Sequence, residues 1–316
     1  MKTSSIMALA ATCTVAACSY QDSEPESMPE TIDLRLDFNS SMIYTGATNS
    51  NDVIKAGDGK AYDIRHTVEA WSTDIDGTPA APYKRIVLTK DDIIDPDCDV
   101  ELTLEDGAYI LYVWTDYVPS GTSADYFYDT SDLRKITLTG GHKGNNDYLD
   151  AFFGRSEIKV SHDSEGKPVI SGGDITMERA VAKYDFYTLD LSDFVRGLSK
   201  DVSDLERCKV TFFYTGRIPS VFNAVTGSTV ATRAGVEFST TVRLDDARMT
   251  SLGFDYMLTD EDENDISVVV GIFSEDGRLL STTGHIKIPV ERNVHSSIGC
   301  TFIQPVDLGA EAEITQ

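Results

Sequence analysis

The feature that most constrains this chain is an alternation of apolar and polar residues with a period of two, repeated in many short segments. The first such segment alternates at Ile32, Leu34, Leu36 and Phe38, and further segments cover residues 64–70, 100–104 and 133–138. Turn signals such as Asp106-Gly107 separate the segments. No long amphipathic helix interrupts the series. A period of two predicts strands with one buried face, and many short strands predict sandwiches or barrels, so we expect an all-β fold.

The strand segments fall into two series of similar length. Gly172-Gly173 is the strongest boundary signal between them. Just before it, residues 157–160 and 168–170 flank Glu165-Gly166 and predict a hairpin. We therefore expect two tandem β-sandwich domains, over residues 31–172 and 173–308, followed by a tail at 309–316.

The first 17 residues are expected to be a lipoprotein signal peptide. Residues 6–17 are apolar or small and uncharged, which is too short to span a bilayer but suits a signal-peptide core. Val15, Ala16 and Ala17 then form a cleavage box before Cys18, whose thiol would carry the lipid. The alternative is an ordinary secretory signal that happens to contain a cysteine.

Residues 18–30 are expected to be a lipidated, acidic tether, because they are polar, carry two prolines and cannot bury a core. The lipid on Cys18 makes a membrane the first expected partner. We expect the protein to be lipid-anchored in an outer membrane and exposed at the cell surface. A generic linker is the alternative reading of this acidic stretch.

The charge and the cysteines narrow the range of functions. The formal net charge of −25 would repel phosphates, so no nucleic-acid partner is expected. If Cys18 is lipidated, Cys98, Cys208 and Cys300 remain in the mature chain, and an odd number cannot all pair. We expect these three to be core residues rather than disulfide or zinc sites.

The residues that could carry chemistry give weak signals. The five histidines have no metal-binding spacing, and neither a phosphate loop nor a GxSxG turn occurs, so no enzyme, cofactor or metal is expected. The acidic run at 260–265 could offer oxygens to calcium, but it lacks the spaced loop pattern and a solvated hairpin loop is preferred. Tyr126, Phe127 and Tyr128 could contact a glycan if their rings were exposed, although a buried or half-buried loop is the preferred interpretation.

Several segments resemble the fimbrillin-related and fimbrial anchor-like lipoproteins of Bacteroidales, including an uncharacterised surface-lipoprotein branch. The resemblance rests on NNDYLDAFFG at 145–154, MERAVAKYDFYTLDL at 177–191, TFFYTGRIPSVFNAVTG at 211–227, LGFDYMLTD at 252–260 and IPVERNVHSSIGCTFI at 288–303. It implies tandem transthyretin-like β-sandwiches and a role in type V fimbriae, where a strand of one subunit inserts into another.

The resemblance also implies which role to expect. Stalk subunits of such fimbriae lose an N-terminal strand by cleavage after an arginine, and neither Arg35 nor Arg155 is convincing as a cleavage site. We therefore expect a fimbrial anchor or accessory, adhesin-like subunit that associates with fimbrial subunits through β-strand addition. The expected edge strand is the first one, with Ile32, Leu34, Leu36 and Phe38. The alternative is an outer-membrane lipoprotein that binds glycans.

Overall fold

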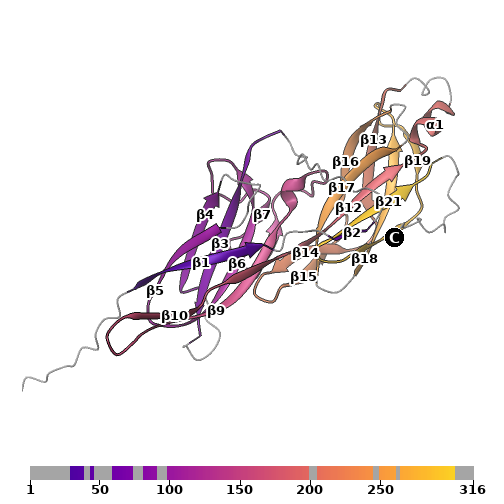
Figure 1. Ribbon diagram of the computed structural model, residues 1–316. Helices are drawn as coiled ribbons and strands as arrows, with labels where there is room; N and C mark the ends of the chain where they lie inside the picture. The colour runs from indigo at the N-terminus through magenta and orange to yellow at the C-terminus, as the bar shows by residue number, and fades with distance from the viewer. Residues whose placement is uncertain are drawn as a thin grey trace, which may run out of the picture.

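The computed structural model describes residues 29–38, 43–45, 59–73, 81–90, 98–198, 205–244, 249–260 and 264–302. The fold is all-β, as the alternation predicted, with one short helix, α1 (Leu191–Arg196), and one 3-10 turn, η1 (Asp147–Leu149). The strands form two bodies along one elongated molecule, with α1 at one end and the start of β1 (Glu30–Phe38) towards the other (Figure 1).

The N-terminal body is built from one continuous eight-stranded sheet in the order β4-β3-β6-β9-β11-β1-β5, with β10 paired to β9. The predicted hairpin is confirmed, because β9 and β10 pair antiparallel from Ile158↔Gly172 to His162↔Pro168. The remaining strands are β3 (Tyr62–Ser72), β4 (Lys84–Lys90), β5 (Cys98–Leu104), β6 (Gly107–Pro119), β9 (Phe152–His162), β10 (Pro168–Gly172) and β11 (Ile175–Arg179).

The alternation in β1 correctly predicted which of its side chains are buried. Ile32, Leu34, Leu36 and Phe38 are all buried, and the residues between them are exposed. The prediction that β1 is an edge strand is wrong. The sheet order places it between β5 and β11: it pairs antiparallel with β5 from Glu30 to Leu36 and parallel with β11 from Leu36 to Phe38. A period of two reports the buried face of a strand, whereas edge position depends on hydrogen bonds in the plane of the sheet.

The eight-stranded sheet folds over on itself. Side chains from β1 and β5 share one hydrophobic core with side chains from β3, β6 and β9, although these strands lie in different parts of the same sheet. Strands β4, β3, β6 and β9 therefore form one layer, and β1 and β5 form the facing layer, with β11 at the fold. We call this the N-terminal core.

The C-terminal body is a sandwich of two separate sheets. One has the order β17-β12-β21-β2 and the other has the order β16-β13-β18-β19, with β20 paired to β18. Their facing side chains form one core, and its members with described side chains lie between Ala182 and Phe302. The strands are β2 (Ile43–Thr45), β12 (Val181–Thr188), β13 (Arg207–Tyr214), β16 (Glu237–Arg243), β17 (Thr250–Leu258), β18 (Asn264–Phe273), β19 (Leu279–Thr282), β20 (Ile286–Val290) and β21 (Val294–Cys300).

Strands cross between the two bodies. β2 comes from the N-terminal part of the chain but pairs parallel with β21. A further four-stranded sheet, in the order β15-β14-β8-β7, joins β7 (Tyr128–Asp129) and β8 (Ile136–Leu138) to β14 (Ile218–Asn223) and β15 (Ser228–Arg233). This sheet contributes to an aromatic core that we call the junction core, where Trp114 contacts Phe222 across a ring-centroid distance of 5.7 Å.

The glycine pair that predicted the domain boundary marks a kink within one sheet. Gly172 and Gly173 have φ values of 84° and 109°, and a Cβ at Gly172 would lie 2.1 Å from the carbonyl oxygen of Glu157. Only glycine fits this backbone, which ends β10 and lets β11 pair with both β9 and β1. Because β10 and β11 lie in the same sheet, we propose that the division between the bodies falls at Ala180.

Candidate functional site

The predicted lipidation site lies outside the described residues. Val15, Ala16, Ala17 and Cys18 precede the first described residue, Pro29, so their role stays a prediction. The described chain enters the fold at Glu30, whose carboxylate accepts a hydrogen bond of 3.1 Å from Nε2 of His162. Asp106 contacts the other ring nitrogen of His162 at 2.8 Å, and both carboxylates raise the pKa of this imidazole.

The aromatic residues considered for glycan contact are mostly buried. Phe127 is 5% exposed and Tyr128 is 1% exposed, so their assignment as glycan contacts is wrong. Tyr128 packs edge-on against Trp114 and donates a hydrogen bond of 2.5 Å to the carbonyl of Leu149. Tyr126 alone is half-buried, and its hydroxyl accepts a hydrogen bond of 3.0 Å from Nζ of Lys60. One half-exposed ring is a small platform for a sugar.

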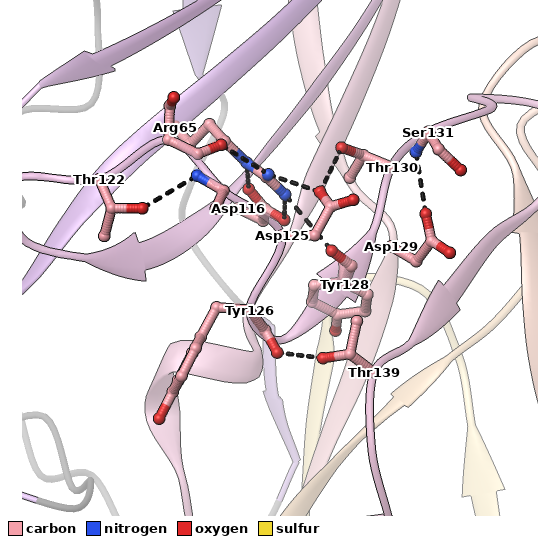
Figure 2. A network of polar contacts seen from close by, with 12 residues as sticks. Arg65, Asp116, Thr122, Asp125, Tyr126, Tyr128, Asp129, Thr130, Ser131 and Thr139 are labelled. Atoms are coloured by element: carbon pink, nitrogen blue, oxygen red, sulfur yellow. Dashed lines mark hydrogen bonds and ion pairs between the residues drawn. The ribbon is translucent and has the colours of Figure 1, made fainter.

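A buried ion pair holds the segment that carries these aromatic residues (Figure 2). Nε and Nη2 of Arg65 donate to the two carboxylate oxygens of Asp116 at 2.8 and 2.6 Å. Nη1 of Arg65 donates to Asp125 at 2.6 Å, and the hydroxyl of Thr130 donates to the same oxygen at 2.8 Å. Arg65 on β3 thus anchors the 123–130 segment to the outer face of the eight-stranded sheet.

Sequence analysis did not single out Arg65 or Asp116, because a charged residue within a strand is normally expected to face solvent. Both are buried, with side-chain exposures of 2% and 0%. Burial raises the pKa of Asp116 to about 6, even though Arg65 opposes this shift. Bidentate pairing is the geometry that makes a buried carboxylate tolerable. A signal was available for Asp116, which interrupts a strand that is apolar on both faces, but not for Arg65, which occupies a regular polar position of the alternating segment 64–70.

A second set of polar contacts connects the two bodies through residues 142–150. The Nε2 atom of His142 contacts the buried carboxylate of Asp255 on β17, and the hydroxyl of Tyr214 contacts the same carboxylate. His142 lies in the loop that follows β8, so an imidazole from the N-terminal body completes a polar cluster of the C-terminal body.

The turn η1 continues this connection. Asp147 accepts a hydrogen bond of 2.6 Å from Lys183 on β12. Asp150 accepts two from Arg179 on β11, at 2.7 and 3.0 Å, and Nη1 of Arg179 also donates to Asn293 at 2.5 Å. Each of these carboxylates has a cationic partner, so the group has the composition of a structural clasp. We call residues 142–150 the junction clasp.

A polar groove of the C-terminal sandwich lies between β16 and β17 and has a volume of about 270 Å³. Residues 240–243 and 249–253 line it, together with Asn145. The hydroxyl of Thr240 donates to the carbonyl of Leu252 at 2.6 Å, and the amide of Asn145 donates to the carbonyl of Phe254 at 2.7 Å. Both bonds have a carbonyl of β17 as acceptor, so they tie β16 and the 142–150 segment to this strand.

The remaining sequence expectations concern cysteines, metals and membranes. Cys208 and Cys300 are buried in the C-terminal core, as expected, and burial raises the pKa values of their thiols to about 11 and about 12. Within the described part of the chain, no group of three or more His, Cys, Asp or Glu side chains is arranged to hold a metal ion. The same residues include no helix with the length and apolar character needed to cross a membrane.

The comparison with known families assigns the chain. A model described as a family of unknown function, DUF6562, matches residues 25–305, which is most of the sequence. The chain belongs to this family. No curated protein matches it.

The solved structures that resemble this member of DUF6562 include fimbrial proteins, the group that the sequence resembles. The fimbrial anchor protein Mfa2 from Porphyromonas gingivalis has 12% identity and a TM-score of 0.43, covering 81% of this chain and 82% of that one. The C-terminally truncated tip fimbrial protein Mfa3 from the same organism has 11% identity and a TM-score of 0.39, covering 85% of this chain and 94% of that one. A candidate cell adhesion protein from Bacteroides ovatus has 12% identity and a TM-score of 0.41, covering 89% of this chain and 95% of that one. All three TM-scores lie below 0.5, so none assigns a function to this chain.

Proposed function

We propose that this protein is a cell-surface lipoprotein that serves as an anchor or accessory subunit of a fimbrial assembly, held in the outer membrane through lipid on Cys18. The observation that carries the proposal is the connection between the cleavage box and the fold. Only 11 residues lie between Cys18 and Glu30, which opens a strand that lies between β11 and β5 in a continuous sheet. Force applied at the lipid would therefore enter the molecule along β1.

The placement of β1 supports a role under tension. Its hydrogen bonds to β5 run from Glu30↔Leu104 to Leu36↔Cys98, and its C-terminal end pairs with β11 as well. A pull along the strand loads these bonds together rather than one after another. The junction clasp and the shared sheet then connect this body to the C-terminal one. A lipoprotein cysteine carries two or three acyl chains, and each buried methylene contributes about 0.8 kcal/mol, so the attachment is firm.

The working chemistry of such a subunit is association through strand edges rather than catalysis. Main-chain hydrogen bonds at an open edge supply affinity, and alternate side chains supply register. The glycan-binding alternative loses most of its proposed contacts, because Phe127 and Tyr128 are buried.

The substitution Cys18→Ala tests the proposal. We expect the variant to fold normally, because Cys18 precedes the described fold, and to leave the membrane fraction for a soluble fraction. Fractionation of cells expressing either form, with circular dichroism of the purified proteins, measures both properties. A matched control is Cys13→Ala, which should stay with the membrane. Retention of Cys18→Ala in the membrane fraction would refute lipid anchoring.

Association is tested separately. Extraction in mild detergent should recover the wild-type protein together with other fimbrial subunits, identified by mass spectrometry. Recovery as a lone monomer would count against a role in an assembly, even if the lipid anchor were confirmed.

A further inference from the structure

A single imidazole joins three elements where the described chain enters the fold. His162 ends β9, Glu30 opens β1, and Asp106 lies in the turn between β5 and β6. The Nε2 atom of His162 lies 3.1 Å from a carboxylate oxygen of Glu30, and its Nδ1 atom lies 2.8 and 3.1 Å from the two carboxylate oxygens of Asp106. We call Glu30, Asp106 and His162 the entry latch.

The geometry of the entry latch sets the charge of the imidazole. An ionised carboxylate only accepts hydrogen bonds, and a neutral imidazole has a single N–H. Both contacts can be hydrogen bonds only if both ring nitrogens carry a proton, so the geometry requires His162 to be an imidazolium. In agreement, Asp106 and then Glu30 raise the pKa of this imidazole above its ordinary value of 6.5.

The charged groups that act on the ring are the two carboxylates of the latch, as far as the described residues show. On the neighbouring strand β10, the uncharged Pro168 lies opposite His162. The charged side chains of the hairpin loop engage one another instead. Lys167 pairs with Glu165 at 2.7 Å, and Asp163 accepts hydrogen bonds from the main-chain amides of both residues. The protonation of the ring is therefore coupled to the latch itself.

The two contacts of the ring differ, so they should open in order. Asp106 contacts Nδ1 through both oxygens and makes the largest contribution to the raised pKa, whereas Glu30 contacts Nε2 through one oxygen. When the ring loses one proton, we expect the remaining N–H to stay on Nδ1. The bare lone pair of Nε2 then faces a carboxylate oxygen, which is repulsive. Glu30 is thus released while His162 and Asp106 stay together.

The start of β1 has few other contacts to hold it. In the described part of the chain, β11 pairs with β1 only from Leu36 to Phe38, so the first residues of the strand pair on one side, with β5. Glu30↔Leu104 is the outermost pair of that ladder. The side chains of His162 and Glu30 are 23% and 27% exposed, so water reaches both. Local opening should therefore begin at this end of the strand once the latch is open.

We propose that the entry latch is a pH-sensitive fastening for the start of β1, closed while His162 is charged and opened at Glu30 when the ring becomes neutral. A raised pKa means that the folded chain binds this proton more tightly than the unfolded chain. The stabilisation is fully present below pH 6.5 and is lost as the pH rises through the pKa of the folded state. Under the proposed function, β1 receives the load from the lipid, so the latch makes its hold on that load depend on pH. The inference rests on the proposed function for this role alone.

Nitrogen NMR of protein labelled at its histidine rings tests the charge and the order of opening. Between about pH 6 and about pH 9, His162 should titrate with a pKa above the ordinary value, and its neutral ring should keep the proton on Nδ1. Asp106→Asn and Glu30→Gln should each lower this pKa, the first by more. The spectrum of His162→Gln identifies the signals of the ring. A pKa that neither carboxylate variant changes, or a neutral ring protonated on Nε2, would overturn the proposal.

Amide hydrogen exchange tests whether the strand responds. Protection factors, which remove the intrinsic effect of pH on exchange, should fall several-fold over residues 31–33 as His162 titrates and should stay constant at Leu36. In His162→Gln the side chain cannot titrate, so protection at the start of β1 should no longer change with pH. The matched control is His285→Gln, which replaces an exposed histidine of the C-terminal body and should keep the wild-type response. Constant protection over residues 31–33 in the wild type would overturn the proposal.

The two proposals can fail separately. Fractionation of Cys18→Ala and copurification with fimbrial subunits measure anchoring and association, and neither depends on His162. If protection over residues 31–33 did not follow pH, the latch would be refuted while anchoring could still be observed. If anchoring failed while NMR and hydrogen exchange gave the expected result, the latch would stand and only its role under load would be lost.

Discussion

The two bodies of this molecule complete their cores in different ways. The C-terminal body closes two facing sheets around a core whose members, among the residues with described side chains, all lie within 182–302. The N-terminal body has its own core between residues 32 and 177, and the β4 residues Ile86 and Leu88 that pack against it stay partly exposed. Its other sheet face is covered only with help from the C-terminal chain, because Phe222 and Ala224 belong to the junction core. The division of the chain is therefore not a division of stability.

The difference teaches that the N-terminal sheet supports two cores at once. The junction is filled with aromatic rings and is crossed by the ion pair of Lys183 with Asp147 and by the hydrogen bond from Arg179 to Asn293, so the two bodies should behave as one unit. Side chains from the two faces of β6 enter the junction core and the N-terminal core, so loss of either core should weaken the same sheet.

The largest effect should come from breaking the shared core with Phe222→Ala. This ring is 0% exposed and lies 5.7 Å from the ring of Trp114 and 5.1 Å from that of Phe153, between centroids. We expect a loss of about 3–5 kcal/mol in the free energy of unfolding. Calorimetry should also show one thermal transition becoming two, because the bodies lose their common core.

The control for this prediction is Phe212→Ala, which removes an equally buried ring from the core between the two sheets of the C-terminal body. Phe212→Ala should lower the free energy of unfolding by a similar amount, but it should not split the thermal transition into two. If Phe222→Ala changed the unfolding free energy by less than about 1 kcal/mol, the idea of a shared core would be wrong.

A smaller effect should appear with pH and should come from the N-terminal body. Burial lowers the pKa of His66 from 6.5 to about 4, and its Nδ1 contacts the hydroxyl of Thr115 at 2.9 Å. The unfolded chain binds this proton below pH 6.5 and the folded chain does not, so stability is lost as the pH falls from 6.5 to about 4. At about 1.4 kcal/mol per pH unit, the loss reaches about 3 kcal/mol.

Urea unfolding at several pH values measures this slope. The variant His66→Gln can keep a hydrogen bond to Thr115 but cannot titrate, so the difference between wild type and variant isolates the imidazole from the carboxylates that titrate in the same range. A difference that stays constant between pH 4 and 6.5 would contradict the assignment.

The smallest effect concerns β5, the last strand in the order of the eight-stranded sheet. Asp33 on β1 lies directly opposite Glu101 on β5, and both are exposed. Like charges in this position are unfavourable, so Glu101→Lys should raise the free energy of unfolding by about 0.2–1 kcal/mol. Thr103→Lys, opposite Thr31, is the matched control and should give less. A destabilised Glu101→Lys would contradict the β1–β5 register.

The sequence predicted the strands better than their neighbours. The period of two in residues 32–38 correctly assigned the buried face of β1, and Glu165-Gly166 correctly predicted the hairpin of β9 and β10. The edge position of β1 was wrong, because local alternation carries no information about which strands pair beside it. The burial of Phe127 and Tyr128 also depends on distant residues, since Arg65 and Trp114 hold and cover that segment.

The exchange of β2 has a consequence for how the protein reaches its native state. Its residues Ile43–Thr45 pair with Val294–Ser296, so one of the earliest parts of the chain to be made meets one of the last. A contact across some 250 residues has a large loop-closure cost and slows folding. If the chain is exported as proposed, the C-terminal sheet cannot be completed while the chain is still crossing a membrane. Final folding should then follow the end of export, and the chain would stay unfolded enough to cross until that point.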